Sequence, residues 1–277
     1  SRPSVAAMTN LTVLELCSGA GGQSIGLERA GFIHVAAIDN DADACTTIQR
    51  NRPAWRVIEQ DIAETDGREF RGVDLIAAGV PCPPFSIAGK QLGENDERDL
   101  FPQALRLIDE AQPAAILIEN VRGLATDKFK DYRARVLHEL EVLGYHGSWR
   151  LLNASDYGVP QLRPRMILVA LRPQLKGRFE WPHQTRTPPT VGEALVDLMA
   201  ANGWPGAEQW AIDACSIAPT IVGGSKKHGG PDLGPTRARE KWRQLRVDGL
   251  GIANAAPEAD FPLDGIPRLT TRMVARI

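Results

Sequence analysis

The first 182 residues of the chain alternate between short apolar runs and longer stretches in which apolar residues recur every three or four positions. Short apolar runs predict buried strands, and the longer period predicts amphipathic helices. Strands are expected at 11–16, 34–39, 55–61, 73–79, 114–121 and 165–171, and helices at 23–32, 41–51, 98–111 and 127–145. Because strands and helices alternate, we expect an α/β fold with a mostly parallel sheet and helices on both faces.

The pattern changes after residue 182. One short helix is expected within 183–206, whereas residues 218–267 are rich in Gly, Pro and Arg and show little periodicity. A structureless loop of about 50 residues is improbable inside a compact core. We therefore interpret 183–267 as a second, smaller and loop-rich domain whose loops serve binding.

Composition narrows the class of protein. The four cysteines form no CxxC pair, which argues against a disulfide framework or a zinc site and favours a reducing compartment. No apolar run is long enough to span a bilayer, and residues 1–10 lack the apolar core of a signal peptide. We expect a cytoplasmic protein that binds neither metal nor membrane. The formal net charge of −2 does not by itself indicate nucleic-acid binding.

A glycine-rich segment, LELCSGAGGQSIG, joins the first strand to the first helix. Gly19, Gly21 and Gly22 let the backbone turn sharply and approach a ligand, although the last glycine of GxGxxG is missing. Asp39 ends the second strand, where a carboxylate can bind ribose hydroxyls, and Asp61 ends the third, where it can accept an adenine amine. No lysine follows the glycines, which excludes a P-loop. We expect a nucleoside cofactor, either a dinucleotide or S-adenosylmethionine (SAM); a tight turn without a ligand is the alternative.

A single thiol, Cys82, follows the fourth strand in the segment GVPCPPFS. Pro81, Pro83 and Pro84 fix φ around it, as suits a nucleophile that must meet a ring face at a set angle. The alternative is a small buried hydrophobe in a Pro-rich turn. The polar segment 86–99 contains two glycines, so we expect a mobile loop that closes over the substrate.

Polar residues also end or precede two other strands. Glu119 and Asn120 end the apolar strand 114–121, at the sheet edge where open α/β folds bind ligands. Gln161, Arg163 and Arg165 alternate into the last strand, so their side chains are expected to share a face. The alternative for Glu119 is a carboxylate that caps a helix, and the alternative for the two arginines is a solvated edge of the sheet.

A thiol, a carboxylate and an arginine pair beside a nucleoside site suit methylation of cytosine at carbon 5. A thiolate that adds to ring carbon 6 makes carbon 5 reactive, and a protonated carboxyl at nitrogen 3 stabilises the adduct. Arginines can hold the carbonyl oxygen, and methyl transfer from a sulfonium needs no metal. Loss of the carbon-5 proton and expulsion of the thiolate regenerate the enzyme. The base must be flipped out, because a stacked base hides both faces.

The same segments resemble the motifs of the DNA cytosine-5 methyltransferases of bacterial restriction–modification systems, in the same order. ELCSGAGG is similar to their first motif, GVPCPPFSIAGKQ to the catalytic loop, IENV to the carboxylate motif and QLRPR to the Gln-x-Arg-x-Arg motif. RLTTRMVARI resembles the helix after the target-recognition domain. The resemblance implies a Rossmann-like SAM-dependent methyltransferase sheet in 1–182, a target-recognition domain in 183–267 and the start of a helix returning to the catalytic domain in 268–277.

The resemblance also implies residue roles. Cys82 would be the nucleophile and Glu119 the acid at nitrogen 3, with Arg163 and Arg165 contacting base and phosphate. SAM, converted to S-adenosylhomocysteine, would be bound by Cys17, Gly19, Ala20, Gly21, Gly22, Asp39, Asn40, Asp61, Ile62, Pro81 and Leu100. Double-stranded DNA would be contacted by Ser86, Lys90, Gln91, Gln161, Thr220, Gly223, Gly224, Lys226, Lys227, Arg237 and Arg239.

A basic segment carries part of the expected DNA surface. Between residues 225 and 247, seven lysines and arginines face two acidic residues, a local excess of five positive charges. Thr220 and Ile221 resemble the dipeptide at the entry to the family's sequence-reading loops. Lys and Arg there can serve phosphate or guanine. An ordinary solvated surface is the alternative.

The chain departs from the family in places. Cys17 and Ser18 occupy positions where Phe and Ala are frequent, and Pro83 a position where Gln is common. A GN-x-x-P-P-like segment, the family's last motif, has no counterpart in the sequence. We therefore expect either a fragment or a second polypeptide that supplies this motif. Apolar residues of 11–16 and 23–32 would then face solvent.

Three other functions remain as alternatives. One is a cytosine-5 methyltransferase acting on transfer RNA, although the long basic domain favours DNA. A second is a catalytically incomplete DNA-binding subunit that needs another chain. A nucleotide-dependent oxidoreductase is the third, and it leaves Cys82, Glu119 and the arginine pair unexplained.

Overall fold

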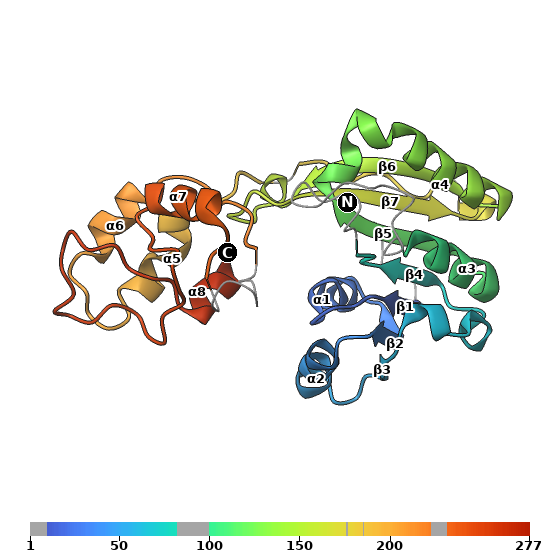
Figure 1. The fold of residues 1–277 in the computed structure, drawn as a ribbon, viewed down its shortest axis with the longest axis horizontal. Helices are drawn as coiled ribbons and strands as arrows, with labels where there is room; N and C mark the ends of the chain where they lie inside the picture. The colour runs from blue at the N-terminus through green and yellow to red at the C-terminus, as the bar shows by residue number, and fades with distance from the viewer. Residues whose placement is uncertain (1–9, 82–99, 176, 185, 223–231) are drawn as a thin grey trace, which may run out of the picture. The chain divides into compact units, whose positions relative to one another are not determined.

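The computed structural model describes residues 10–81, 100–175, 177–184, 186–222 and 232–277. The chain divides into two compact units (Figure 1). The first comprises residues 1–151 and 165–181, and the second comprises residues 152–164 and 182–277. The 13 residues 152–164 therefore lie in the second unit, although the strands on either side of them belong to the sheet of the first.

The first unit is built on a seven-stranded sheet with the order β3-β2-β1-β4-β5-β7-β6. The strands are β1 (Thr12–Leu16), β2 (Ile33–Asp39), β3 (Val57–Glu59), β4 (Leu75–Ala78), β5 (Ala115–Val121), β6 (His146–Asn153) and β7 (Pro164–Leu171). All pairs from β3 to β5 are parallel, and β7 is antiparallel to β5. The strand order reverses between β1 and β4, which is where open α/β sheets bind ligands.

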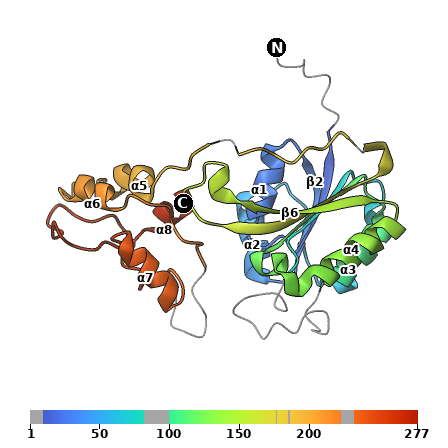
Figure 2. The ribbon, with the colours of Figure 1, turned by 90° about the horizontal axis from the view of Figure 1, so that it is seen from above.

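Four helices cover the sheet: α1 (Gly22–Arg29), α2 (Ala42–Asn51), α3 (Phe101–Ala111) and α4 (Lys130–Val142). Figure 2 shows α1 and α2 on one face and α3 and α4 on the other. Alternate residues of β1 explain this arrangement, because successive side chains of a strand point to opposite faces. Val13 packs with Leu27 of α1, whereas Leu14 packs in the larger core with Leu107 of α3. The expected α/β fold with helices on both faces is confirmed.

Two strands differ from the expectation. β6 was not predicted. Its residues are either half-buried or exposed, so its sequence does not contain the continuous apolar run that indicates a buried strand. This strand lies at the edge of the sheet, where only one neighbour is needed. The strand expected at 55–61 is limited to Val57–Glu59, since its ends serve as turns. The proline at position 102 lies in the first turn of α3, as expected.

The expectation that apolar residues of 11–16 and 23–32 face solvent holds for Leu11 and Ile25 and is wrong for the other large apolar residues. Val13, Leu14 and Leu16 are fully buried, because β1 is a central strand between β2 and β4 with packed residues on both faces. Leu27 of α1 is also buried. Only Leu11, just before β1, and Ile25 of α1 are large exposed hydrophobics in this region.

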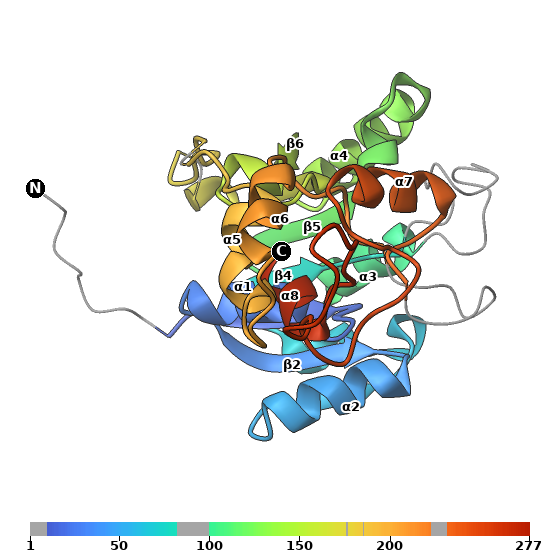
Figure 3. The ribbon, with the colours of Figure 1, turned by 90° about the vertical axis from the view of Figure 1, so that its left-hand side faces the viewer.

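The second unit contains α5 (Val191–Met199), α6 (Ala207–Asp213), α7 (Thr236–Gln244) and α8 (Thr271–Arg276), which Figure 3 shows. Its core includes three tryptophans and the apolar residues of α5 and α8. α5 is the expected short helix, but α6 and α7 were not predicted. α7 escaped prediction because it is highly charged and buries little beyond Trp242. The segment 268–277, expected to return to the catalytic domain, packs in this unit through Met273.

Candidate active site

The carboxyl ends of the parallel strands enclose a small cavity in the first unit. Its volume is about 70 Å³, and its walls are Cys17, Asp39, Asn40, Gln60, Asp61, Ile62, Pro81 and Leu100. Every wall residue except Gln60 belongs to the predicted cofactor set. Gln60 could have been inferred from its place between the third strand and Asp61, where it caps the strand by donating its backbone N–H to Asp39 O.

The glycine-rich turn lies beside this cavity and is held by Asp39. One carboxylate oxygen of Asp39 accepts the N–H of Gly19 at 2.7 Å, and the other accepts the N–H of Asp41 at 2.9 Å. Gly19 and Gly21 have φ values of 53° and 90°, which favour glycine. Asp39 therefore joins the turn after β1 to the start of α2. None of the four predicted turn residues Gly19, Ala20, Gly21 and Gly22 is a wall of the cavity, which the turn borders through Cys17.

The cavity carries a negative field. Burial, followed by the nearby carboxylates of Asp39 and Asp61, raises the pKa of the Cys17 thiol to about 12. The same carboxylates favour a positively charged ligand, because a field that opposes a thiolate attracts a cation. Cys17 is therefore a neutral thiol at physiological pH and not a nucleophile.

This field can be measured through the reactivity of Cys17. With its pKa raised from 9.0 to about 12, Cys17 should be alkylated roughly 10³-fold more slowly at neutral pH than an unperturbed thiol, because only the thiolate reacts. Iodoacetamide labelling followed by mass spectrometry across pH gives the titration, with exposed Cys215 as the internal reference. Asp39→Asn should move the Cys17 profile to lower pH. A Cys17 profile that is the same in Asp39→Asn as in the wild type would contradict the field, because burial alone would then account for the raised pKa.

The residues present fit SAM. Asp39 and Asp61 offer carboxylate oxygens, and SAM presents ribose hydroxyls, an adenine amine and a cationic sulfonium to such acceptors. Asp61 uses one oxygen to accept the N–H of Ala63 at 2.8 Å, which holds the carboxylate in place. The enclosed volume is well below the roughly 300–1,000 Å³ of a typical small-molecule site. The described walls would therefore contact only part of the cofactor.

An ion pair joins the ends of β5 and β7. Arg165 Nε lies 2.5 Å from Glu119 Oε1, and the two side chains are 21% and 33% exposed. The antiparallel pairing places Val121 opposite Arg165, so the register brings the guanidinium within reach of the carboxylate two residues earlier. Two predicted catalytic side chains therefore meet at the edge of the sheet where the cofactor cavity lies.

Asn120 fixes the backbone that leads toward the predicted nucleophile. Its side chain is 1% exposed, donates to Val80 O at 3.5 Å and accepts the N–H of Val121 at 2.7 Å. The N–H of Gly79 donates to Leu16 O at 3.1 Å, and a Cβ on Gly79 would lie 3.2 Å from Cys17 O. The end of β4 is thus tied to β1 and β5. Cys82 itself lies outside the described residues, as do the predicted DNA contacts Ser86, Lys90 and Gln91.

Comparisons with known proteins decide the family. The model of the C-5 cytosine-specific DNA methylases matches residues 11–277. The chain belongs to this family. It is 55% identical to the type II methyltransferase M.NaeI of Lentzea aerocolonigenes over 98% of this chain and 66% of that protein. It is 50% identical to the type II methyltransferase M.NgoMIV of Neisseria gonorrhoeae over 96% of this chain and 85% of that protein.

A solved structure agrees on the fold. DNMT2 of Spodoptera frugiperda superposes with a TM-score of 0.59 and 21% identity, covering 85% of this chain and 78% of that one. The expected family, the DNA cytosine-5 methyltransferases, and its methyltransferase fold are confirmed. The oxidoreductase alternative is wrong. The chain spans 66% of the length of M.NaeI, so the activity of the complete protein is treated below as a proposal.

Gln161, a predicted DNA contact, has its partners inside the second unit. Gln161 is 6% exposed, its amide N–H donates to Ile277 O at 3.2 Å, and its carbonyl accepts the N–H of Ile221 at 3.1 Å. Both ends of the buried amide are hydrogen-bonded within the second unit, as buried polar groups usually are, and the DNA contact of Gln161 stays a prediction. The hydroxyl of Thr220 donates to Leu162 O, so the predicted entry to the recognition loops is tied to the QLRPR segment.

The other predicted contacts of the second unit fall into two groups. Gly223, Gly224, Lys226 and Lys227 lie outside the described residues. The structure does describe the three arginines. Arg237 is exposed on α7, and Arg239 is half-buried on the same helix. The backbone N–H of Arg163 donates to the side-chain oxygen of Asn153.

The described residues offer neither a metal site nor a membrane-spanning helix. Among the described residues, no group of three or more His, Cys, Asp or Glu side chains could hold a metal ion. Every helix in the part of the chain that the structure describes is too short or too polar to cross a bilayer.

Proposed function

We propose that the protein methylates carbon 5 of a flipped-out cytosine in a specific duplex DNA sequence, through a covalent adduct with Cys82. The observation that carries the proposal is the Glu119–Arg165 pair beside the acid-lined cavity, with Asn120 bound to the backbone at Val80. SAM supplies the methyl group when bound, held by Asp39 and Asp61.

Each residue has one task in this proposal. Cys82 adds to carbon 6 of the ring, and Glu119 in its protonated form donates to nitrogen 3 as charge develops there. Arg165 orients the Glu119 carboxyl from the neighbouring strand. In this proposal it also contacts the base or its phosphate. Asn120 is a positioning residue, since it acts on the backbone before Cys82 and touches no substrate.

The relatives suggest the biological setting. Both are named type II methyltransferases, which belong to restriction–modification systems, and we infer the same setting in a bacterial cytoplasm. The proposal is tested with labelled SAM, duplex DNA of mixed sequence and transfer RNA. Label at carbon 5 of cytosine in the duplex supports it. Label only in transfer RNA, or in neither nucleic acid at saturating SAM, contradicts it.

Whether a second polypeptide completes the cofactor pocket stays a prediction. The small volume enclosed by the described walls is compatible with further walls supplied from elsewhere. The same methylation assay, repeated with an added segment of the GN-x-x-P-P type, separates a chain that needs such help from one that does not.

Lysines of the basic segment are expected to contribute phosphate contacts. Replacing Lys226 and Lys227 with Ala should weaken DNA binding and reduce the slope of log K against log salt by roughly one unit per lost contact. Fluorescence anisotropy across a salt series measures the slope. Arg29→Ala combined with Arg50→Ala, on exposed positions of α1 and α2, is the matched control. An unchanged slope in the lysine variant would show that these residues do not touch phosphate.

A further inference from the structure

The loop after β3 carries two walls of the cofactor cavity but has little secondary structure of its own. Asp61 begins the single turn η1 (Ile62–Glu64), and both Asp61 and Ile62 line the cavity. Two backbone hydrogen bonds close this turn, from Glu64 N to Asp61 O at 3.0 Å and from Thr65 N to Ile62 O at 3.3 Å. The position of the two walls therefore depends on contacts from outside the loop.

Arg106 of α3 supplies those contacts. Its Nη1 donates to Thr65 O at 3.0 Å, and its Nη2 donates to Ile62 O at 2.8 Å and to Ala63 O at 3.3 Å. The carboxylate of Asp61 accepts the N–H of Ala63, so it is fixed to the same piece of backbone. One guanidinium thus holds three carbonyl oxygens of the loop that carries Asp61.

The guanidinium is itself held from the side of α3. Its Nε donates to Gln103 Oε1 at 2.9 Å, and its Nη1 lies 2.8 Å from Glu110 Oε1. Burial opposes ionisation of Glu110, but the hydrogen bonds from Arg106 and from the N–H of Gly67 outweigh it and hold the pKa of this carboxyl below its ordinary value. Glu110 is therefore charged at neutral pH and anchors Arg106 to the helix.

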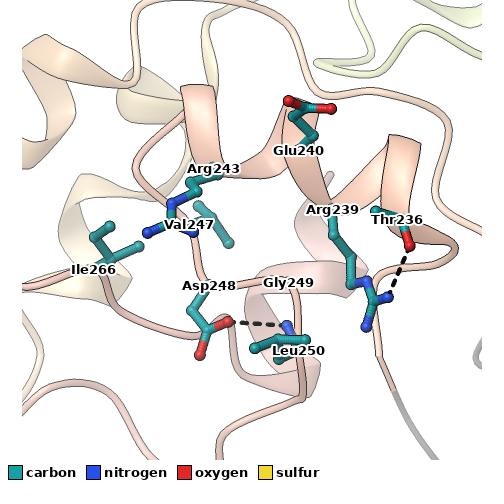
Figure 4. Close-up of a pocket in the computed structure, with 9 residues that line it drawn as sticks. All are labelled: Thr236, Arg239, Glu240, Arg243, Val247, Asp248, Gly249, Leu250 and Ile266. Atoms are coloured by element: carbon teal, nitrogen blue, oxygen red, sulfur yellow. Dashed lines mark hydrogen bonds between the residues drawn. The ribbon is translucent and has the colours of Figure 1, made fainter.

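The hydrogen bonds of Arg106 use the five N–H donors that a guanidinium has. Arg239, which lines a cavity of about 600 Å³ in the second unit, differs: among the described residues, it donates a hydrogen bond only to the hydroxyl of Thr236, at 3.2 Å (Figure 4). Arg106 has no donor left for a ligand, and it is not among the walls of the cofactor cavity. It therefore acts on the protein chain.

Leu100 brings a third wall into this arrangement. It lines the cavity and is the residue at which α3 begins. Arg106 lies on the same helix, so it ties the wall at Leu100 to the walls at Asp61 and Ile62, which precede β4 in the sequence. The separation of these walls therefore depends on one side chain.

We propose that Arg106 is a positioning residue of the cofactor site, which holds the wall formed by Asp61 and Ile62 in place relative to Leu100. The inference rests on the proposed function, because it assigns a role toward the cofactor of the methyl transfer. Loss of Arg106 should weaken SAM binding and leave the chemical step at saturating SAM intact, because Arg106 contacts the walls and not the reacting atoms.

The test is calorimetric binding of S-adenosylhomocysteine, which does not depend on catalysis. Arg106→Lys keeps the charge beside Glu110 but cannot span three carbonyl oxygens, so the Kd should rise by about 10- to 100-fold, the effect of one or two lost hydrogen bonds to a charged group. In steady-state methylation the KM for SAM should rise by a similar factor, and kcat should stay within about threefold of the wild type.

Arg52→Lys is the matched control. Arg52 also pairs with a glutamate, Glu28, at 2.6 Å, and this pair joins the ends of α1 and α2 that lie away from the glycine-rich turn. Thermal melting, followed by circular dichroism, separates stability from affinity. Both variants should melt earlier than the wild type, but only Arg106→Lys should lose affinity for S-adenosylhomocysteine.

A double-mutant cycle tests whether Arg106 acts through Asp61. If it does, Asp61→Asn and Arg106→Lys together should weaken binding by less than the product of their separate factors. Factors that multiply fully would overturn the inference, and so would an Arg106→Lys variant that melts earlier but binds S-adenosylhomocysteine like the wild type. Weaker binding by Arg106→Lys, in a protein that methylates no DNA, would support the role of Arg106 and contradict the proposed function.

Discussion

Replacing Cys82 with Ser is expected to lower the rate of DNA methylation by on the order of 10⁴-fold or more, as the loss of an essential nucleophile does in other enzymes. A serine hydroxyl is a far weaker nucleophile near neutral pH, so it cannot add to carbon 6 of the ring. Transfer of labelled methyl groups to duplex DNA measures the effect under single-turnover conditions.

Two controls accompany this variant. Cys215→Ser changes an exposed thiol of the second unit and should methylate DNA like the wild type. SAM binding by Cys82→Ser, measured by calorimetry, should persist because the acidic walls at Asp39 and Asp61 are unchanged. Turnover of Cys82→Ser at the wild-type rate would show that the reaction does not pass through this thiol.

Glu119→Gln is expected to slow methylation by about 10²–10⁴-fold, the usual contribution of a general acid. Glutamine keeps the shape of the side chain and can still accept from Arg165, but it has no acidic proton to give to nitrogen 3. Single-turnover methylation and the rate of covalent adduct formation should fall together. SAM affinity should be unchanged, because Glu119 is not a wall of the cofactor cavity.

The matched control is Glu28→Gln on α1. Glu28 also pairs with an arginine, Arg52, at 2.6 Å. This variant removes an ion pair of the same unit without touching the proposed reaction. If Glu119→Gln loses SAM affinity and keeps its chemical rate, Glu119 belongs to the cofactor site.

Much of the predicted cofactor site could be located from the sequence, because the strands that end beside it could be located. A carboxylate that ends a buried parallel strand lies at the ligand-binding edge of the sheet, as Asp39 does at the end of β2. The same reasoning placed Glu119 at the end of β5. Periodicity locates such residues along the chain, and the parallel topology brings their ends together.

Features that depend on partners distant in sequence were not predictable. Gln161 looked like a DNA contact because it alternates with two arginines, yet its amide binds the backbone at Ile221. The role of Asn120 rests on a bond to Val80, 40 residues earlier. α7 was missed because it is highly charged and buries only Trp242, whose partners lie elsewhere in the second unit.

The central claim is a covalent adduct between Cys82 and a flipped-out cytosine, and trapping tests it most directly. Fluorine at carbon 5 cannot leave as a proton does, so the adduct on DNA containing 5-fluorocytosine cannot resolve. With SAM present, the wild-type protein should form a complex with this DNA that survives denaturing electrophoresis, and Cys82→Ser should form none. Methylation of ordinary DNA by the wild type, without any trapped complex on the fluorinated DNA, would contradict the account.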